Sequence, residues 1–377
     1  MNDFAGALQL RPGAPVPHNL RSTRQTWASR VAPGRAASDL PGLLSGLFSL
    51  CGHAHRTASQ LAIRVVEPGL FPSVQPVAAL LQRETALEHL RRIGLDWPRL
   101  LASADPAVTA AAAESLRHCP LIRQPADPAP WPAMRQWLQD EWLHMAPATW
   151  LRAWQACGTD WLLDWSQRHP GWLPTLLRAV RPADVALPFA AALRPHAEPA
   201  SLRAVGAALA LSDAFALQPR WHGQVAHTGP WTRLHERAPG QAWTAWSLLG
   251  SRLAELVRLC LPDAPSETGA GWLAWGALPT GERQGLAWVE MARGLLIHQV
   301  ALADAAPGAA PVVRSCQVLA PTEWNLHPEG VAAQALATLP ADAPDLDARV
   351  HLLMAALDPC VPFQVTPRDE TLEVSHA

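Results

Sequence analysis

The pattern of apolar residues changes near residue 270, and this change constrains the fold more than any other feature of the chain. Before it, apolar residues recur at helical spacing, as Leu44, Leu47 and Leu50 do. After it, two apolar stretches, 294–303 and 311–319, flank the turn-rich sequence DAAPGAAP. The pattern predicts an α+β protein, mainly α, with a β-hairpin toward the C-terminus.

Helices are predicted over most of the remaining chain. They cover residues 39–66, 76–94, 106–118, 182–193, 199–217, 241–261, 328–339 and 344–357. Asp39 is the expected N-cap of the first helix, with Pro41 in its first turn. Residues 120–132 are rich in proline and are expected to be a connection.

The length of 377 residues suits one large domain or two ordinary ones. Residues 1–38 are expected to be an irregular, proline-rich segment that wraps the body. We expect residues 39–377 to form a single domain. Within it, 39–270 would be a helical body, and 271–377 would hold the hairpin and the C-terminal region.

A tryptophan-rich segment covers residues 131–172. Its side chains at Trp150, Trp154, Cys157, Trp161 and Trp165 fall within about 80° on a helical wheel. Such an aromatic face most often packs inside a protein, and that is the interpretation we prefer. The alternative is a docking surface for a partner helix.

Charge and cysteine usage narrow the classes of protein. The net charge is −2 and the pI is near 6.7, so no basic surface for nucleic acid is expected. No apolar run reaches the ~18 residues that indicate a membrane span, and the N-terminus lacks a secretion signal. The six cysteines form no CxxC pair, which is typical of cytoplasmic thiols rather than disulfides.

Four short stretches carry the chemistry that can be inferred from this sequence. They are LCGHAH from Leu50, VEMARGLLIH from Val289, VLAPTEWNLHP from Val318 and DPC from Asp358. In sequence and in order, they resemble motifs of the large subunits of nickel–iron hydrogenases. The resemblance implies a shortened large-subunit-like fold in which the two ends of the chain meet at a metal site.

The departures from those motifs are informative. The family has C-G-x-C-x-x-x-H and D-P-C-x-x-C-x-x-H, whereas this chain has Ala54 and Phe363 at the second cysteine positions. Thr366 stands at the histidine position of the second motif, and a three-residue deletion would align His55 with that of the first. One thiol therefore remains from each pair.

Two thiols cannot hold and bridge both metals of a nickel–iron centre, because the bridging cysteines are absent. We therefore expect no bound nickel, no hydrogen turnover and no enzymatic activity.

By the same resemblance, iron alone could be held, together with its two cyanides and one carbon monoxide. Cys51 and Cys360 would be its thiolate ligands, and His55 would be either a further ligand or a hydrogen-bond donor to one of the thiolates. Cyanide nitrogens accept hydrogen bonds and need donors. Arg293 would donate to one cyanide and the Thr322 hydroxyl to the other, with Pro321 shaping the wall of the site.

Three more residues are expected to contact these ligands and donors: Glu290, His298 and Asp358. Each also has a purely structural interpretation. Glu290 could simply pair with Arg293, His298 could be an interior histidine, and Asp358 could end a helix together with the proline that follows it.

The chain is identified as a member of the HupK/HoxV family of accessory proteins, which are degenerate relatives of the large subunit. This resemblance implies a scaffold that transiently binds the Fe(CN)2(CO) unit. The scaffold would receive the unit from other maturation proteins and pass it to the precursor of the large subunit. Two alternatives remain open: a metal-free chaperone or mimic of the large subunit, and a redox protein that uses Cys51 and Cys360 as a dithiol.

Overall fold

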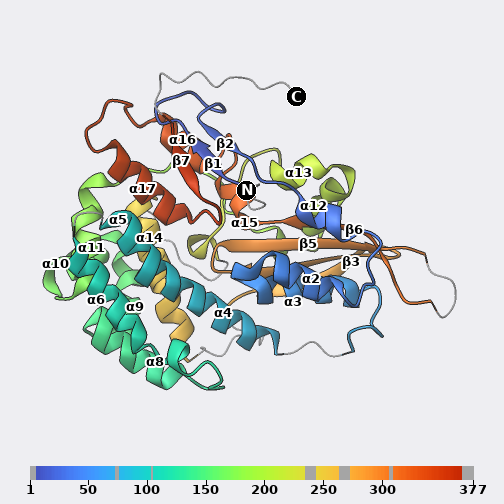
Figure 1. Ribbon diagram of the computed structural model, residues 1–377, viewed down its shortest axis with the longest axis horizontal. Helices are drawn as coiled ribbons and strands as arrows, with labels where there is room; N and C mark the ends of the chain where they lie inside the picture. The colour runs from blue at the N-terminus through green and yellow to red at the C-terminus, as the bar shows by residue number, and fades with distance from the viewer. Residues whose placement is uncertain are drawn as a thin grey trace.

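The structure is a computed structural model that describes residues 6–72, 76–102, 105–233, 243–262, 272–304 and 309–366. A helical body lies beside a four-stranded sheet, which α3 covers (Figure 1). The helices are α1 (Trp27–Val31), α2 (Leu40–Leu47), α3 (Gly52–Arg64), α4 (Val77–Arg91), α5 (Trp97–Leu101), α6 (Pro106–Arg117), α7 (Pro120–Arg123), α8 (Trp131–Trp137), α9 (Pro147–Cys157), α10 (Thr159–Arg168), α11 (Trp172–Val180), α12 (Pro199–Leu211), α13 (Asp213–Leu217), α14 (Ala245–Cys260), α15 (Pro321–Asn325), α16 (Val331–Ala337) and α17 (Leu346–Leu357). The strands are β1 (Leu8–Leu10), β2 (Leu20–Ser22), β3 (Trp275–Gly281), β4 (Gln284–Met291), β5 (Gly294–Leu302), β6 (Val313–Leu319) and β7 (Phe363–Val365). The predicted α+β class, mainly helical, is confirmed.

The larger sheet has the antiparallel order β3-β4-β5-β6. Its two faces are buried by different elements. Leu296 and Val300 join the main core, which includes α3, whereas Leu295 and Ile297 pack with α12. Because β5 is covered on both faces, it is buried along its whole length, and its sequence is mostly apolar rather than alternating.

The hairpin predicted over 294–303 and 311–319 is confirmed as β5 and β6, although part of its turn, 305–308, lies outside the described residues. The sequence analysis missed β3 and β4, whose burial alternates only weakly.

The second sheet joins the two ends of the chain. It has the order β2-β1-β7, and β1 pairs in parallel with β7, so that Leu8 lies opposite Phe363 (Figure 1). Leu8 and Leu10 are fully buried. The segment expected to be irregular, 1–38, therefore contains two strands and α1, because its apolar residues complete the core.

The single helix predicted over 39–66 is wrong: it is split into α2, a short 3-10 turn and α3. Phe48 and Cys51 leave the helical conformation at the break. The chain folds back so closely that a Cβ on Gly52 would lie 2.9 Å from the Ser45 carbonyl oxygen. Asp39 does precede α2, with Pro41 at its start, but its side chain makes no capping hydrogen bond.

The helix predicted over 182–193 is also wrong. This segment is mostly extended, because its backbone pairs with other loops: the Leu187 N–H donates to the Trp243 carbonyl, and Ala192 bridges to His227. The proline-rich connection 120–132 contains the short helix α7. The other predicted helices correspond to α4, α6, α12 with α13, α14, α16 and α17.

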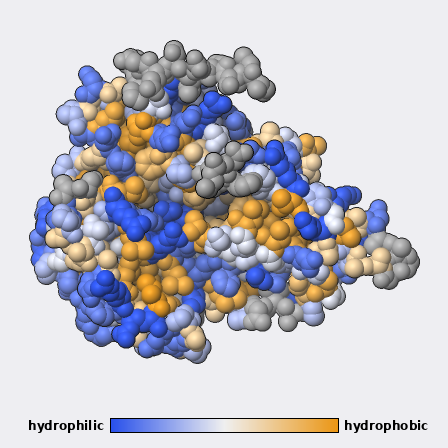
Figure 2. Space-filling view, in the orientation of Figure 1, coloured by the Kyte–Doolittle hydropathy of each residue, from blue (hydrophilic) through white to orange (hydrophobic). Residues whose placement is uncertain are grey.

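The tryptophan-rich segment is not one helix, because Gly158 has a positive φ of 53° and separates α9 from α10. Trp150, Trp154 and Trp165 are nevertheless buried in the core, as the preferred interpretation predicted, whereas Trp161 is half-buried and Cys157 is exposed. Hydrophilic and hydrophobic areas alternate on the face of the molecule in Figure 2, without one dominant apolar surface. Among the described residues, no helix is both long enough and apolar enough to cross a membrane.

Candidate metal-binding site

Cys51 lies at the N-cap position of α3, where the break after α2 leaves it outside the helix. Its side chain does not cap the helix. Glu84 on α4 does so instead, accepting hydrogen bonds from the backbone N–H groups of His53 at 2.7 Å and Ala54 at 2.8 Å. The helix end is thereby satisfied by another element, and the Cys51 thiol remains free for a ligand.

Cys360 follows the end of α17. The helix stops at Asp358, which takes a left-handed conformation with φ 56°. The Asp358 carboxylate is fully enclosed by three guanidinium groups: Arg92 on one oxygen, and Arg252 at 3.2 Å and Arg293 at 3.4 Å on the other. This carboxylate fixes the position of the turn that presents Cys360.

Arg293 occupies the two-residue turn between β4 and β5. Its Nη1 donates to Glu88 of α4 at 2.9 Å, in addition to the contact with Asp358. The next residue, Gly294, has φ 129°, and a Cβ there would lie 2.4 Å from the Thr228 hydroxyl oxygen. Only glycine is accommodated in that position, so the turn that presents Arg293 depends on it.

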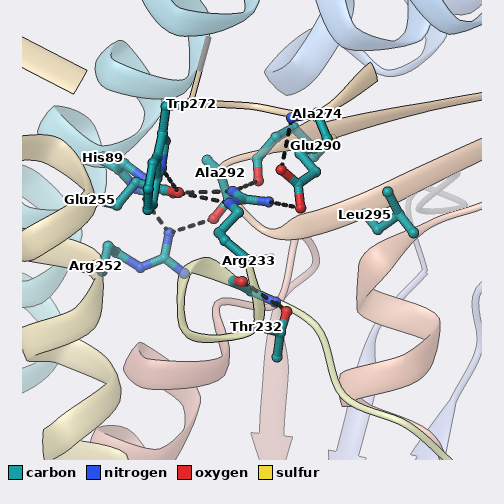
Figure 3. A network of polar contacts seen from close by, with 12 residues as sticks. His89, Thr232, Arg233, Arg252, Glu255, Trp272, Ala274, Glu290, Ala292 and Leu295 are labelled. Atoms are coloured by element: carbon teal, nitrogen blue, oxygen red, sulfur yellow. Dashed lines mark hydrogen bonds and ion pairs between the residues drawn. The ribbon is translucent and has the colours of Figure 1, made fainter. Parts of the chain in front are cut away.

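A buried network of polar side chains donates hydrogen bonds to the backbone of this turn (Figure 3). Arg233 donates to both oxygens of Glu255 at 2.7 and 3.1 Å and to the Met291 carbonyl at 2.7 Å. Arg252 donates to the Ala292 carbonyl at 3.3 Å. The two carbonyl groups that precede Arg293 are therefore each bound by a buried guanidinium.

His89 completes the network as a neutral ring. Arg252 can only donate, so His89 Nδ1 accepts at 3.2 Å, and its Nε2–H donates to Glu255 at 2.8 Å. Burial lowers the pKa of His89 to about 4, despite the hydrogen bond to Glu255 that raises it. The neutral tautomer follows from both observations.

Thr322 is the second residue of α15, after the buried Pro321. Its hydroxyl oxygen lies 3.7 Å from the Cys360 sulfur and accepts a hydrogen bond from Arg24. Arg24 also pairs with Glu323 at 3.0 Å. The start of α15 and the N-terminal segment therefore meet beside the Cys360 thiol.

The pKa of the Cys51 thiol depends on the charged groups around it, which include Cys360. Burial raises the pKa of Cys51 far above its ordinary value, Arg293 lowers it, and Glu84, Glu88 and Cys360 add to the increase. In the structure Cys51 is therefore a neutral thiol, and a metal must displace its proton. Cys51 and Cys360 stand 309 positions apart in the sequence, and both raise the pKa of Arg293, so each lies within electrostatic range of its guanidinium.

His55 and His298 contact each other, with His55 Nδ1 3.0 Å from His298 Nε2. His55 also stacks on Phe48 at 4.1 Å. Burial lowers the pKa of both rings, so neither carries a charge at neutral pH. The structure does not bring His55 together with both cysteines as a group of three ligands.

Glu290, which the sequence analysis expected to pair with Arg293, contacts other residues instead. Its carboxylate faces Arg233 and His196, each at 3.6 Å, and accepts from the Ala274 N–H at 2.8 Å (Figure 3). Glu88 and Asp358 take the role of pairing with Arg293.

Several site residues were missed by sequence reasoning. Glu84 and Glu88 on α4 and Arg92 directly after it recur at four-residue spacing, and that charged stripe could have indicated them. Arg24 follows a three-residue strand, and no pattern in the sequence indicated it.

This site offers fewer protein ligands than a structural metal ion needs. Among the described residues, no group of three or more His, Cys, Asp or Glu side chains is arranged to hold a metal ion. A structural zinc ion, by contrast, is held by four protein ligands.

Comparison with known proteins identifies relatives over the whole chain, although no family model matches it. The chain is 38% identical to the hydrogenase expression/formation protein HoxV of Cupriavidus necator, over 99% of this chain and 98% of that protein. It is 30% identical to the hydrogenase expression/formation protein HupK of Bradyrhizobium diazoefficiens, over 90% of each.

Solved structures with the same fold are hydrogenases. An NAD+-reducing [NiFe]-hydrogenase aligns with a TM-score of 0.50 at 16% identity, over 93% of this chain and 97% of that one. A variant of the [NiFeSe] hydrogenase from Desulfovibrio vulgaris Hildenborough gives a TM-score of 0.53 at 14% identity, over 90% and 92%. The fold is that of a shortened hydrogenase large subunit, and the chain belongs to the HoxV/HupK family of hydrogenase expression/formation proteins.

Proposed function

We propose that this protein acts in hydrogenase maturation as a scaffold that transiently binds an iron–cyanide–carbonyl unit and passes it to the hydrogenase large subunit. Two observations support the proposal: the Cys360 sulfur lies 3.7 Å from the Thr322 hydroxyl oxygen, and Cys51 and Cys360 both lie within electrostatic range of Arg293. Its relatives are named for hydrogenase expression and formation, which supports a role in maturation.

The chemistry of the site supports the cargo. An Fe(CN)2(CO) unit already has three ligands, so two thiolates bring the iron to five. Because the protein supplies only two of these ligands, the unit can be released again. Arg293 Nη1 donates to Glu88, Nε is in an ion pair with Asp358 at 3.4 Å, and Nη2 forms no hydrogen bond among the described residues. That N–H group is available to a cyanide nitrogen, and the Thr322 hydroxyl is placed beside Cys360 for the other cyanide.

The number of thiols supports transfer over storage. A complete hydrogenase site holds its metals with four cysteines, whereas this site offers two. With fewer bonds to break, the unit can leave for a site that binds it with more ligands. The same shortage of thiolates is why we propose neither bound nickel nor hydrogen turnover here.

The test is an infrared spectrum of the protein purified from a strain that makes its hydrogenase. We expect bands in the cyanide and carbonyl stretching regions, and we expect Cys51→Ser and Cys360→Ser each to lose them. Cys157→Ser is the matched control, because Cys157 is exposed at the end of α9 and should leave the bands unchanged.

Two other outcomes would contradict the proposal. A wild-type spectrum without these bands, together with normal binding to the large-subunit precursor, would favour the metal-free chaperone. A reversible Cys51–Cys360 disulfide, detected by mass spectrometry of protein kept under cycles of oxidation and reduction, would favour a dithiol redox protein.

A further inference from the structure

Arg24 is a buried cation that lies outside the motifs of the sequence. Its side chain is 13% exposed, and it reaches Thr322 and Glu323 from the segment between β2 and α1. Burial lowers the pKa of Arg24, but Glu323, Cys360 and Cys51 raise it, in that order, and the net shift is upward. Arg24 is thus a second guanidinium, besides that of Arg293, within electrostatic range of both thiols.

The hydrogen bond from Arg24 decides what the Thr322 hydroxyl can do. A hydroxyl has one hydrogen to donate and two lone pairs that accept. Arg24 Nη1 donates to the Thr322 oxygen, so the hydroxyl hydrogen must point away from Arg24. The sulfur of Cys360 lies 3.7 Å from that oxygen, and either atom can be the donor of this contact. With Cys360 as a thiolate the sulfur can only accept, so the hydroxyl hydrogen would then be directed toward the side where the cargo would bind.

The N-terminal segment places Arg24 relative to Cys360 through one sheet. β1 pairs with β2 on one side and with β7 on the other, and β7 begins three residues after Cys360. Arg24 therefore lies two residues after β2, and Cys360 lies three residues before β7 of the same small sheet. Their relative position is fixed by backbone hydrogen bonds rather than by a flexible linker.

We propose that Arg24 is a positioning residue for the cargo, which orients the Thr322 hydroxyl as a donor to one cyanide and adds a second positive charge beside the thiolates. This inference rests on the proposed function. One ferrous ion, two cyanides and two thiolates sum to a net negative charge, and such a group is stabilised by nearby cations in a buried site. Glu323 keeps Arg24 paired when the site holds no cargo.

The test compares Arg24→Gln and Arg24→Lys with wild type by infrared spectroscopy after co-expression with the hydrogenase. In Arg24→Gln we expect the cyanide bands to change frequency. We also expect the bound unit to be lost about ten-fold faster or more during buffer exchange, because a ten-fold change corresponds to the free energy of one charge-assisted hydrogen bond. Arg24→Lys keeps the charge, so it should retain more cargo than Arg24→Gln while still showing altered cyanide bands. The carbonyl band should move less, because carbon monoxide is a poor acceptor.

Arg21→Gln is the control, since Arg21 is an exposed residue of β2 without a side-chain partner among the described residues. Thermal unfolding of every variant checks the fold. If Arg24→Gln does not fold, the infrared bands and cargo retention of Arg24→Lys are compared with those of wild type instead. Unchanged cyanide frequencies and cargo retention in the folded Arg24 variants would overturn this inference and leave the scaffold function intact. If wild type itself shows no bands, the proposed function fails, and this inference fails with it.

Discussion

At the scale of single residues, Asp358 shows how one side chain can fix a site. Its left-handed backbone ends α17, and its carboxylate meets Arg92, Arg252 and Arg293 from three different elements. The resemblance to the hydrogenase motif indicated that Asp358 matters, but not why. The structure gives the reason: the carboxylate gathers the guanidiniums that surround the cysteine-bearing turn.

Asp358→Asn removes this charge while keeping a residue that tolerates the left-handed conformation. We expect the free energy of unfolding to fall by about 3–5 kcal/mol, because three buried guanidiniums lose their shared partner. Urea denaturation measures the loss. Asp345→Asn, at an exposed pair with Arg349, should change it by about 1 kcal/mol or less.

The pH dependence of this effect has a definite sign. Burial raises the pKa of Asp358, but Arg293, Arg252 and Arg92 lower it below its ordinary value of 3.8. The stabilisation is therefore fully present above about pH 4 and is lost as the pH falls through the folded-state pKa. The difference between wild type and Asp358→Asn should narrow below about pH 4, and a constant difference would contradict this account.

At the scale of elements, the position of Cys51 depends on how closely α3 packs on the sheet. Gly285 of β4 lies directly beneath the helix, where a Cβ would be 2.0 Å from the Ala62 carbonyl oxygen and 2.6 Å from a methyl group of Val65. Neither the backbone of α3 nor that of β4 can give way without moving the whole element. A residue without a side chain is thus required for α3, and with it Cys51, to lie where it does.

Gly285→Ala should destabilise the protein by about 1–3 kcal/mol, because the added methyl group overpacks the helix–sheet contact. We also expect weaker cyanide and carbonyl bands, since α3 would shift relative to α17. Denaturation and infrared spectra measure the two effects. Gly281→Ala is the control: its Cβ would find only the Gln284 side chain at 3.4 Å, so a similar loss in both variants would refute the explanation.

At the scale of the whole molecule, buried charges join the helical body to the sheet. Glu255 on α14 binds Arg233 and His89, and Arg233 in turn holds the β4–β5 turn (Figure 3). Burial raises the pKa of Glu255, but Arg233 and His89 lower it far below its ordinary value, so the carboxylate is ionised. The donors that carry the network thus converge on one carboxylate.

Glu255→Gln should lower the free energy of unfolding by about 3–5 kcal/mol, because the amide nitrogen of glutamine would face N–H donors and Arg233 would lose a charge partner. Chemical denaturation measures this loss. Glu114→Gln, at an exposed pair with Arg117, should have almost no effect. Equal stability of Glu255→Gln and wild type would show that the network does not hold the two parts together.

The sequence by itself determined the helical class and the β5–β6 hairpin, because helical spacing and apolar runs are local patterns. The burial of Trp150 and Trp154 was also correctly preferred, since large aromatic faces are usually internal.

Only the tertiary structure decided the rest. The break before Cys51, the extended segment over 184–194 and the pairing of β1 with β7 depend on contacts between residues far apart in the chain. The same is true of Arg24, which meets Thr322 across 298 positions. The physical reason is that hydrogen bonds and ion pairs between distant segments are formed only after folding brings them together, and local spacing carries no record of them.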